Sequence, residues 1–275
     1  RFVILPMDME YMAAGRLKNT FRYYEQMKEL AAIKRSNPDT CFPFIFADPR
    51  RIREDPAYFS WQTGADGRII LNDCHIKKYM EQEGFSGIKI YPALGYYPFD
   101  EALLPLWKYA AENGIPVLTH CIRGTIYYRG PKKKQWDRHP FFEQSIGNSE
   151  YEPLLLSEKK NADFTINFTH PLNYLCLLEE SLLRRVVAGS GDDIKKLFGY
   201  NGHDIELSGK LGKLKICFGH FGGEDEWRRF FEKDRDNFSS QLVKRPAKGI
   251  DFFNNMKGQQ RHGKMEQLWK YGDWY

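Results

Sequence analysis

The sequence predicts an α/β protein built around a parallel β-sheet. Short apolar runs alternate along the chain with longer segments in which apolar residues recur every three or four positions. The runs are continuously apolar, as is typical of parallel strands that helices cover on both faces. The length of 275 residues fits one α/β domain, and no linker or shift in composition divides residues 1–275.

Five apolar runs predict five strands. They are residues 2–5, 41–47, 87–92, 116–121 and 214–220. Because segments of helical periodicity separate these runs, we expect the strands to lie parallel, in an open sheet or in a barrel.

Two helices are predicted between these strands. Residues 21–33 have apolar side chains at steps of three and four, and Asn19 or Thr20 is placed to cap the first turn. A second helix begins at Asp100, a preferred N-cap residue, and ends at Gly114, just before the next strand.

Two long segments follow predicted strands. About fifty residues separate His120 from the next predicted helix near Pro171, and a polar stretch follows His220. Loops of this length usually serve function. The carboxyl ends of parallel strands are also where α/β enzymes place their sites.

The composition excludes several classes of protein. With 42% hydrophobic and 15% aromatic residues, the chain is neither disordered nor collagen-like. No apolar run approaches the roughly 20 residues needed to cross a membrane. The five cysteines are odd in number and widely spaced, which favours reduced thiols in a cytoplasmic protein.

Two predicted strands end in histidine. His120 closes one strand and His220 closes the next, where Gly222 and Gly223 follow. Adjacent parallel strands lie about 4.8 Å apart, so the two imidazoles should converge. Neutral imidazoles bind divalent cations. The pair indicates a metal or acid/base site, although each histidine alone could simply be hydrogen-bonded at a strand end.

Three further charged residues stand on or just after strands. Lys89 lies between isoleucines in a run expected to be buried, which favours a lysine that faces a site over one that extends to solvent. Asp8 and Asp48 follow the first and second strands. Each could orient a substrate, or could serve a turn or a helix cap.

Positive charge is concentrated in residues 122–138. Six basic residues, Arg123 among them, and one acidic residue give this segment a net charge of +5, equal to that of the whole chain. Tyr127, Tyr128 and Trp136 lie among them. A solvated loop is one interpretation, and attraction of nucleic acid or of an anionic substrate is another. His170, before Pro171, could cap a helix or face the site.

Several familiar motifs are absent from the sequence. It contains no glycine-rich dinucleotide fingerprint, P-loop, serine-hydrolase elbow or His-Glu-x-x-His segment. These absences remove the support for dinucleotide binding, P-loop chemistry, a serine nucleophile and zincin proteolysis.

Five segments together resemble a known superfamily. They are GFSGIKIYP at 84–92, the predicted helix at 100–114, IPVLTH at 115–120, FTHPLNY at 168–174 and LKICFGHFGG at 214–223. Their order and spacing resemble the amidohydrolase superfamily, and in particular the branch that includes aminocarboxymuconate semialdehyde decarboxylase. The resemblance implies a TIM (β/α)8-type barrel, here incomplete with about five to six βα units, and long loops after strands five and six. The five predicted strands would be strands two to six.

The resemblance also implies roles for individual residues. His120 would bind a divalent metal, most commonly Zn²⁺, and His220 would be a second metal ligand or a proton shuttle. Lys89 would be a catalytic lysine, either carboxylated or uncarboxylated and used to bind substrate. In our leading hypothesis Lys89 and Arg123 hold a carboxylate or phosphate of the substrate. The remaining predicted substrate-binding residues are Asp8, Asp48 and His170.

The sequence also departs from the family pattern. No His-x-His pair occurs in it, and Asp273 is a poor substitute for the aspartate that follows strand eight in the family. We therefore expect these residues to be one piece of a longer protein, a single partial barrel domain.

The expected function is that of a cytoplasmic metal-dependent hydrolase. It would cleave a C–N, C–O or similar bond in a small polar or anionic molecule, without a membrane partner. The alternatives are a decarboxylase of the same branch and a catalytically silent relative that binds nucleic acid or other anions through residues 122–138. A nuclease on the same barrel would combine the two, and a homo-oligomer is compatible with the sequence.

Overall fold

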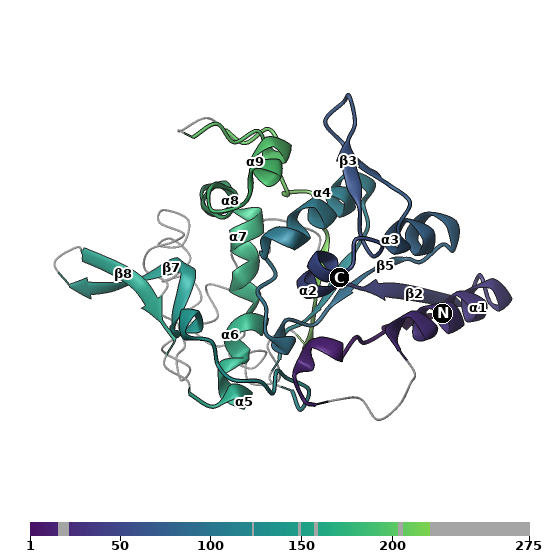
Figure 1. Ribbon diagram of the computed structural model, residues 1–275, viewed down its shortest axis with the longest axis horizontal. Helices are drawn as coiled ribbons and strands as arrows, with labels where there is room; N and C mark the ends of the chain where they lie inside the picture. The colour runs from purple at the N-terminus through teal and green to yellow at the C-terminus, as the bar shows by residue number, and fades with distance from the viewer. Residues whose placement is uncertain (16–21, 123, 148–149, 157–158, 203–205, 221–275) are drawn as a thin grey trace, which may run out of the picture.

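The fold is organised around one parallel sheet. The computed structural model describes residues 1–15, 22–122, 124–147, 150–156, 159–202 and 206–220 (Figure 1). Five strands form the sheet in the order β1-β2-β5-β6-β9, and each neighbouring pair is parallel. The sheet is curled and consistent with part of an α/β barrel. The predicted α/β class and parallel sheet are therefore confirmed.

All five predicted strands form, and each is slightly shorter than its apolar run. They are β1 (Phe2–Ile4), β2 (Cys41–Phe46), β5 (Gly87–Ile90), β6 (Val117–His120) and β9 (Ile216–Gly219). Residues at one or both ends of each run lie outside the hydrogen-bonded strand. Directly after the second run, Asp48 caps α2 (Pro49–Glu54) by accepting a hydrogen bond from the backbone N–H of Arg50.

Two antiparallel hairpins were not predicted from the sequence. One pairs β3 (Trp61–Thr63) with β4 (Ile69–Leu71), and the other pairs β7 (Arg138–Gly147) with β8 (Glu150–Leu155). The second hairpin projects from the body in Figure 1. The segment after β6 is therefore structured over much of its length. Strands β7 and β8 mix charged and apolar residues without regular alternation, so hydrophobic periodicity does not predict them.

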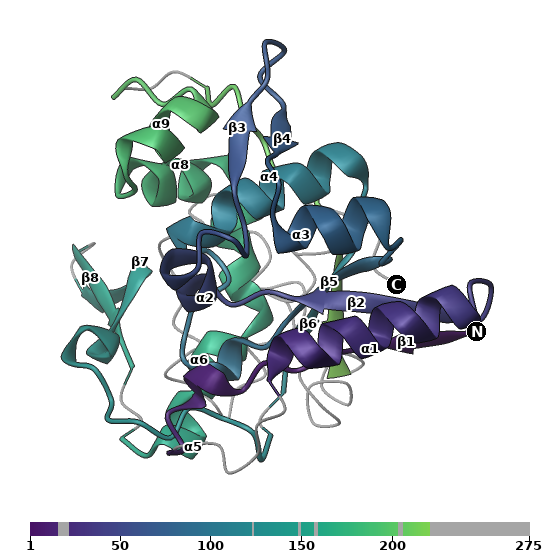
Figure 2. The ribbon, with the colours of Figure 1, turned by 45° about the vertical axis from the view of Figure 1, so that its right-hand side comes forward.

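The first long helix packs against β2. Helix α1 (Tyr23–Ser36) buries Tyr23, Met27, Leu30 and Ala31, and it runs alongside β2 in Figure 2. Its N-cap is Arg22, whereas the predicted caps Asn19 and Thr20 lie outside the described residues. The prediction of this helix is confirmed, displaced by two to three residues.

The second predicted helix is confirmed at both ends. The Asp100 side chain accepts a hydrogen bond from the N–H of Ala102 and caps η4 (Glu101–Leu103), which continues into α4 (Leu104–Asn113). Gly114 ends α4 with a φ of 66°, in the left-handed region that glycine adopts readily.

The remaining helical segments are short. They are η1 (Glu10–Met12), α2 (Pro49–Glu54), α3 (His75–Lys77), η2 (Lys78–Gln82), η3 (Pro92–Leu94), η5 (Lys134–Asp137), α5 (Asn161–Phe164), α6 (Ile166–Thr169), η6 (Pro171–Tyr174), α7 (Leu175–Leu178), α8 (Glu180–Ala188) and α9 (Asp192–Phe198). In the described part of the chain, no helix combines the length and apolar character needed to cross a membrane. All five cysteines are free thiols.

Strand register decides which side chains share a face of the sheet. Lys89 is aligned with Leu118, and Leu118 with Cys217. Side chains alternate along a strand, so Tyr91 and His120 follow on the same face, two positions toward the carboxyl ends. Isoleucines at the intervening positions of β5 are fully buried on the other face.

Candidate active site

Strands β5, β6 and β9 bring four polar side chains together at the carboxyl edge of the sheet. Lys89 lies in β5 and Tyr91 directly follows it. His120 ends β6, where it is aligned with Gly219, and His220 comes immediately after Gly219. The predicted convergence of His120 and His220 is present, with their ring centroids 5.0 Å apart and their planes at 76°.

Tyr91 and His120 form the closest pair in this cluster. Their rings stack with centroids 4.1 Å apart at 14°, and the Tyr91 hydroxyl lies 3.0 Å from Nε2 of His120. Burial raises the pKa of Tyr91, so the hydroxyl keeps its proton at neutral pH and can donate it to that nitrogen. Sequence reasoning missed Tyr91, although its place two residues after Lys89 puts both on one face.

Burial also keeps the imidazole of His120 neutral. Desolvation lowers its pKa to about 3, and the positive charges of Lys89 and His220 act in the same direction. The same burial lowers the pKa of Lys89 to about 8, opposed by the thiols of Cys121 and Cys217. A neutral imidazole keeps a lone pair for a metal or for a proton.

His220 differs from its partner in exposure and backbone conformation. Its side chain is exposed, and its φ is 63°. Apart from Ala13, it is the one residue other than glycine in the described part of the chain with a left-handed φ. Such a conformation costs about 1–3 kcal/mol and tends to occur at functional sites. The exposed imidazole of His220 therefore lies on the solvent side of the cluster, whereas His120 is buried.

The chain after β6 returns very close to the cluster. A Cβ atom on Gly124 would lie 3.0 Å from the Tyr91 hydroxyl and 3.2 Å from Nε2 of His120. Only glycine allows the backbone to approach this closely without moving one of the two rings. Gly124 is thus a second residue of the site that sequence reasoning did not identify.

Both predicted aspartates are buried in ion pairs with arginines. Asp8 accepts a hydrogen bond from Nε of Arg51 at 2.5 Å, and Arg51 also contacts Glu10 at 2.7 Å. The Asp48 carboxylate pairs with Arg50 through Nε at 2.8 Å and Nη2 at 2.6 Å. These contacts fix the segments that follow β1 and β2. A direct substrate contact by either carboxylate stays a prediction.

The other two predicted substrate-binding residues differ in what the structure describes. His170 is buried, and its Nδ1 accepts a hydrogen bond from the N–H of Leu172 at 3.2 Å, so it caps η6. The capping alternative is therefore present, and its contact with substrate stays a prediction. Arg123 lies outside the described residues.

Contacts within the basic segment 122–138 engage some of its described charged side chains. Lys132 pairs with Asp137 at 2.9 Å, and the guanidinium of Arg129 lies 3.7 Å from the ring centroid of Tyr127. Trp136 is only 7% exposed and stacks on Phe164. Its indole is therefore not available for stacking with a nucleobase, as a nucleic-acid interface would require.

The cluster has the type of ligand that a divalent metal requires, but it has too few of them. Catalytic zinc sites usually use three protein ligands and neutral imidazoles. His120 and His220 supply two, and within the described ranges no group of three His, Cys, Asp or Glu side chains is placed to hold an ion. A third ligand would have to come from elsewhere.

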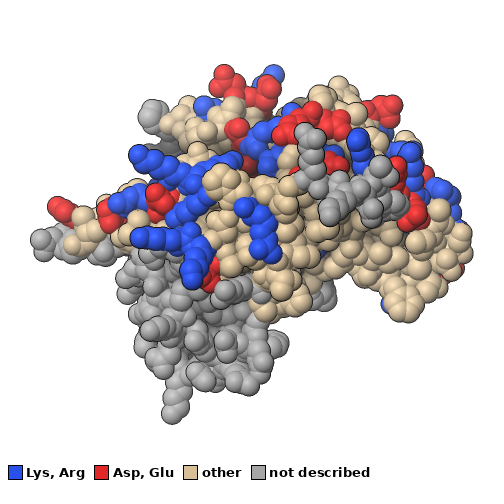
Figure 3. Space-filling model, turned by 60° about the horizontal axis from the view of Figure 1, so that its bottom comes forward, with Lys and Arg blue, Asp and Glu red and all other residues tan. Residues whose placement is uncertain are grey.

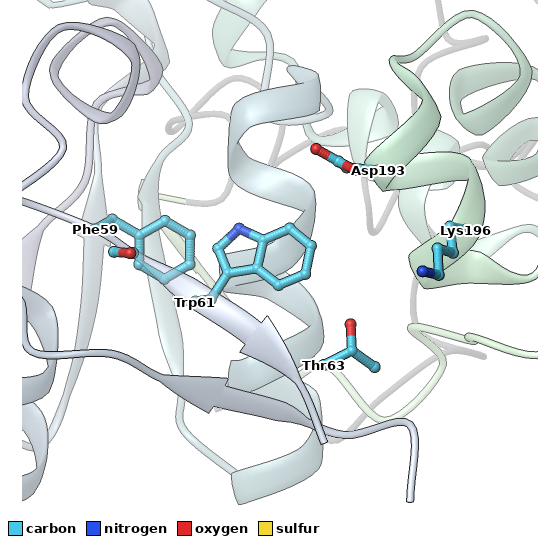
Figure 4. A pocket seen from close by; sticks show the side chains of 6 residues that line it. Phe59, Trp61, Thr63, Asp193 and Lys196 are labelled. Carbon is cyan, nitrogen blue, oxygen red and sulfur yellow. The ribbon is translucent and has the colours of Figure 1, made fainter. Parts of the chain in front are cut away.

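A separate polar groove lies between β3 and α9. It has a volume of about 520 Å³ and is lined by Phe59, Ser60, Trp61, Thr63, Asp193 and Lys196. In Figure 4 the Asp193 carboxylate and the Lys196 ammonium point from α9 toward the indole of Trp61. Neither β3 nor α9 contributes a residue to the cluster around His120, so the groove is not part of that site.

Comparison with known proteins gives no relative. No family model, no curated protein and no solved structure matches the chain. What fold and site together define is an α/β protein with a His–His–Tyr–Lys cluster at the carboxyl edge of a curled parallel sheet.

Proposed function

We propose that this chain forms part of a metal-dependent hydrolase with a TIM (β/α)8-type barrel, in the amidohydrolase superfamily. The observation that carries the proposal is the convergence of His120 and His220 at the carboxyl ends of adjacent strands, with ring centroids 5.0 Å apart. The parallel order of the five strands supports the barrel. The free thiols support a reducing, cytoplasmic compartment.

His120 and His220 are the residues that would hold the metal. When bound, a Zn²⁺ ion would supply a water of lowered pKa and would polarise a substrate carbonyl. The buried, neutral imidazole of His120 provides a fixed ligand. The exposed imidazole of His220 can bind the ion or pass a proton to solvent.

Lys89 would orient the substrate. Its ammonium is buried on the same face of the sheet as Tyr91 and lies 5.5 Å from the centroid of that ring. Lys89 makes no ion pair with a carboxylate in the described part of the chain, so an anionic ligand would stabilise this buried cation. The substrate class is therefore a small molecule that carries a carboxylate or phosphate near the bond to be cleaved.

Zinc binding tests the proposal without knowledge of the substrate. Equilibrium dialysis against Zn²⁺ should show that His120→Ala and His220→Ala each lower the affinity of the 275-residue chain by about tenfold or more. His75→Ala is the matched control, because His75 packs against Tyr24 with ring centroids 4.4 Å apart and is not one of the cluster residues.

The outcomes separate cleanly. A loss confined to the two cluster variants supports the proposed centre. Equal Zn²⁺ affinity in all four proteins, with circular dichroism showing that each is folded, would contradict it.

A further inference from the structure

A second cleft lies between the segment after β5 and the β7–β8 hairpin. Its volume of about 780 Å³ is in the range typical of small-molecule sites. None of the residues that line it belongs to the cluster around His120. The cleft is therefore a separate candidate site.

Aromatic rings form one wall of this cleft. Tyr97 and Phe99 stack with ring centroids 4.8 Å apart at 12°. Phe141 meets Phe99 edge to face at 5.1 Å and is only half-buried. A planar ring from a ligand can pack against such a wall with favourable stacking or edge-to-face geometry.

Basic side chains line the cleft beside this wall. They are Arg50, Arg53, Lys133 and Arg138. Lys and Arg side chains gather on the side of the molecule from which the β7–β8 hairpin projects (Figure 3). An anion that enters the cleft could contact Lys133 and the largely exposed Arg138.

Carboxylates already partner three of these four cations, and Arg50 is held by the buried Asp48. Asp100 already pairs with Arg53, and Glu101 accepts a hydrogen bond from the N–H of Gly191 at 3.1 Å. Arg138 contacts Glu152 at 3.3 Å in a largely exposed pair, which is worth little in water. Lys133 makes no ion pair with any described residue, and its Nζ lies 5.3 Å from the centroid of Trp136.

We propose that this cleft binds a small aromatic anion, a planar ring that carries a phosphate or carboxylate group. The ring would pack against Phe141, the half-buried ring of the aromatic wall, and the anionic group would contact Lys133 and Arg138. The ligand would thus contact Lys133 and Arg138, two basic residues that make no ion pair with the described residues of the segment 122–138. The inference stands independently of the proposed metal centre.

Isothermal titration of the 275-residue chain with three probes tests the chemistry. We expect phenyl phosphate to bind about tenfold more tightly than either inorganic phosphate or phenol. Only phenyl phosphate can contact both the aromatic wall and the basic side chains beside it. Phenyl phosphate binding no more tightly than inorganic phosphate would overturn the proposal, since the aromatic wall would then contribute nothing.

Two neighbouring lysines provide a matched pair of variants. Lys133→Gln should weaken phenyl phosphate binding by about fivefold or more, while Lys134→Gln, which removes the same charge outside the cleft, should change it less than about twofold. Equal losses would indicate non-specific attraction and would overturn the site. Tighter binding of a twelve-residue oligothymidine than of phenyl phosphate, with equal dependence on both lysines, would point instead to nucleic acid.

The same variants keep this proposal separable from the metal centre. Lys133→Gln should leave Zn²⁺ affinity unchanged, because Lys133 is not part of the cluster around His120. Failure of phenyl phosphate binding with intact Zn²⁺ binding would reject the cleft alone.

Discussion

The hydroxyl of Tyr91 lies 3.0 Å from Nε2 of His120, and the two rings stack 4.1 Å apart. Tyr91 therefore fixes the orientation of the imidazole and engages the nitrogen that a metal ion or a proton would also use. The backbone at Gly124 closes over the same pair. Tyr91 and Gly124 therefore hold His120 in place, whereas His220 is exposed.

Removing the Tyr91 hydroxyl should tighten metal binding. In Tyr91→Phe the ring stack is kept, but the hydrogen bond that competes for Nε2 is lost. Such a bond is worth about 0.5–1.5 kcal/mol, so Zn²⁺ affinity should rise by about two- to tenfold in equilibrium dialysis. Weaker binding in this variant would mean that the hydroxyl supports the ligand rather than competing with the ion.

Adding a methyl group at Gly124 should disturb the site. The new Cβ would stand 3.0 Å from the Tyr91 hydroxyl, and forcing the rings apart should cost about 1–3 kcal/mol of unfolding free energy in urea titrations. Gly212→Ala is the control, because nothing lies within 4 Å of the added atom there. Equal effects of the two substitutions would contradict the close approach at Gly124.

His120 should stay neutral well into the acidic range. Because its pKa is lowered to about 3 in the folded protein, the unfolded chain binds the extra proton first as pH falls. The contribution of this neutral imidazole to the free energy of unfolding is therefore fully present above about pH 6.5, and it is lost as pH falls toward about 3.

Proton NMR tests the state of His120 directly. Its Cε1–H signal should not titrate between pH 5 and pH 8, and Lys89→Met should raise its pKa by removing a nearby positive charge. A midpoint near 6.5 in the unmodified protein would refute this prediction.

Replacing Lys89 by methionine should stabilise the fold at neutral pH. Burial lowers the pKa of Lys89 from 10.5 to about 8, so below about pH 8 the folded state bears an unfavourable buried charge. The shift corresponds to about 3 kcal/mol.

The pH dependence distinguishes this effect from simple repacking. Between about pH 8 and 10.5 the unfolded chain binds more protons than the folded one, so the stability of the unmodified protein should rise with pH, and that of Lys89→Met should not. Urea titrations at pH 7 and pH 10 measure both. A variant that is less stable at pH 7 would show that the ammonium has a favourable partner.

Breaking the Asp8–Arg51 pair should destabilise the protein strongly. Asp8 is 1% exposed, so Asp8→Ala would leave the buried guanidinium with Glu10 as its remaining carboxylate partner and should cost about 3 kcal/mol or more. Asp192→Ala breaks an exposed pair with Lys195 at 3.8 Å and should cost less than about 1 kcal/mol. Similar losses in thermal unfolding would remove the structural assignment of Asp8.

The sequence alone predicted the parallel sheet, because continuous apolar runs are a local property of strands buried on both faces. It also predicted the ends of α4, since Asp100 and Gly114 act within one turn of their own position. It missed the β7–β8 hairpin, whose pairing depends on contacts between strands rather than on alternation within each.

For the site, the sequence determined that His120 and His220 end neighbouring strands, and parallel geometry then required them to meet. Only the tertiary structure decided their surroundings: the Tyr91 hydroxyl on Nε2, the backbone of Gly124 against both rings, and arginines bound to Asp8 and Asp48. The physical reason is that strand ends are set by local chain chemistry, whereas burial, ion pairing and the resulting pKa values depend on which distant segments pack around them.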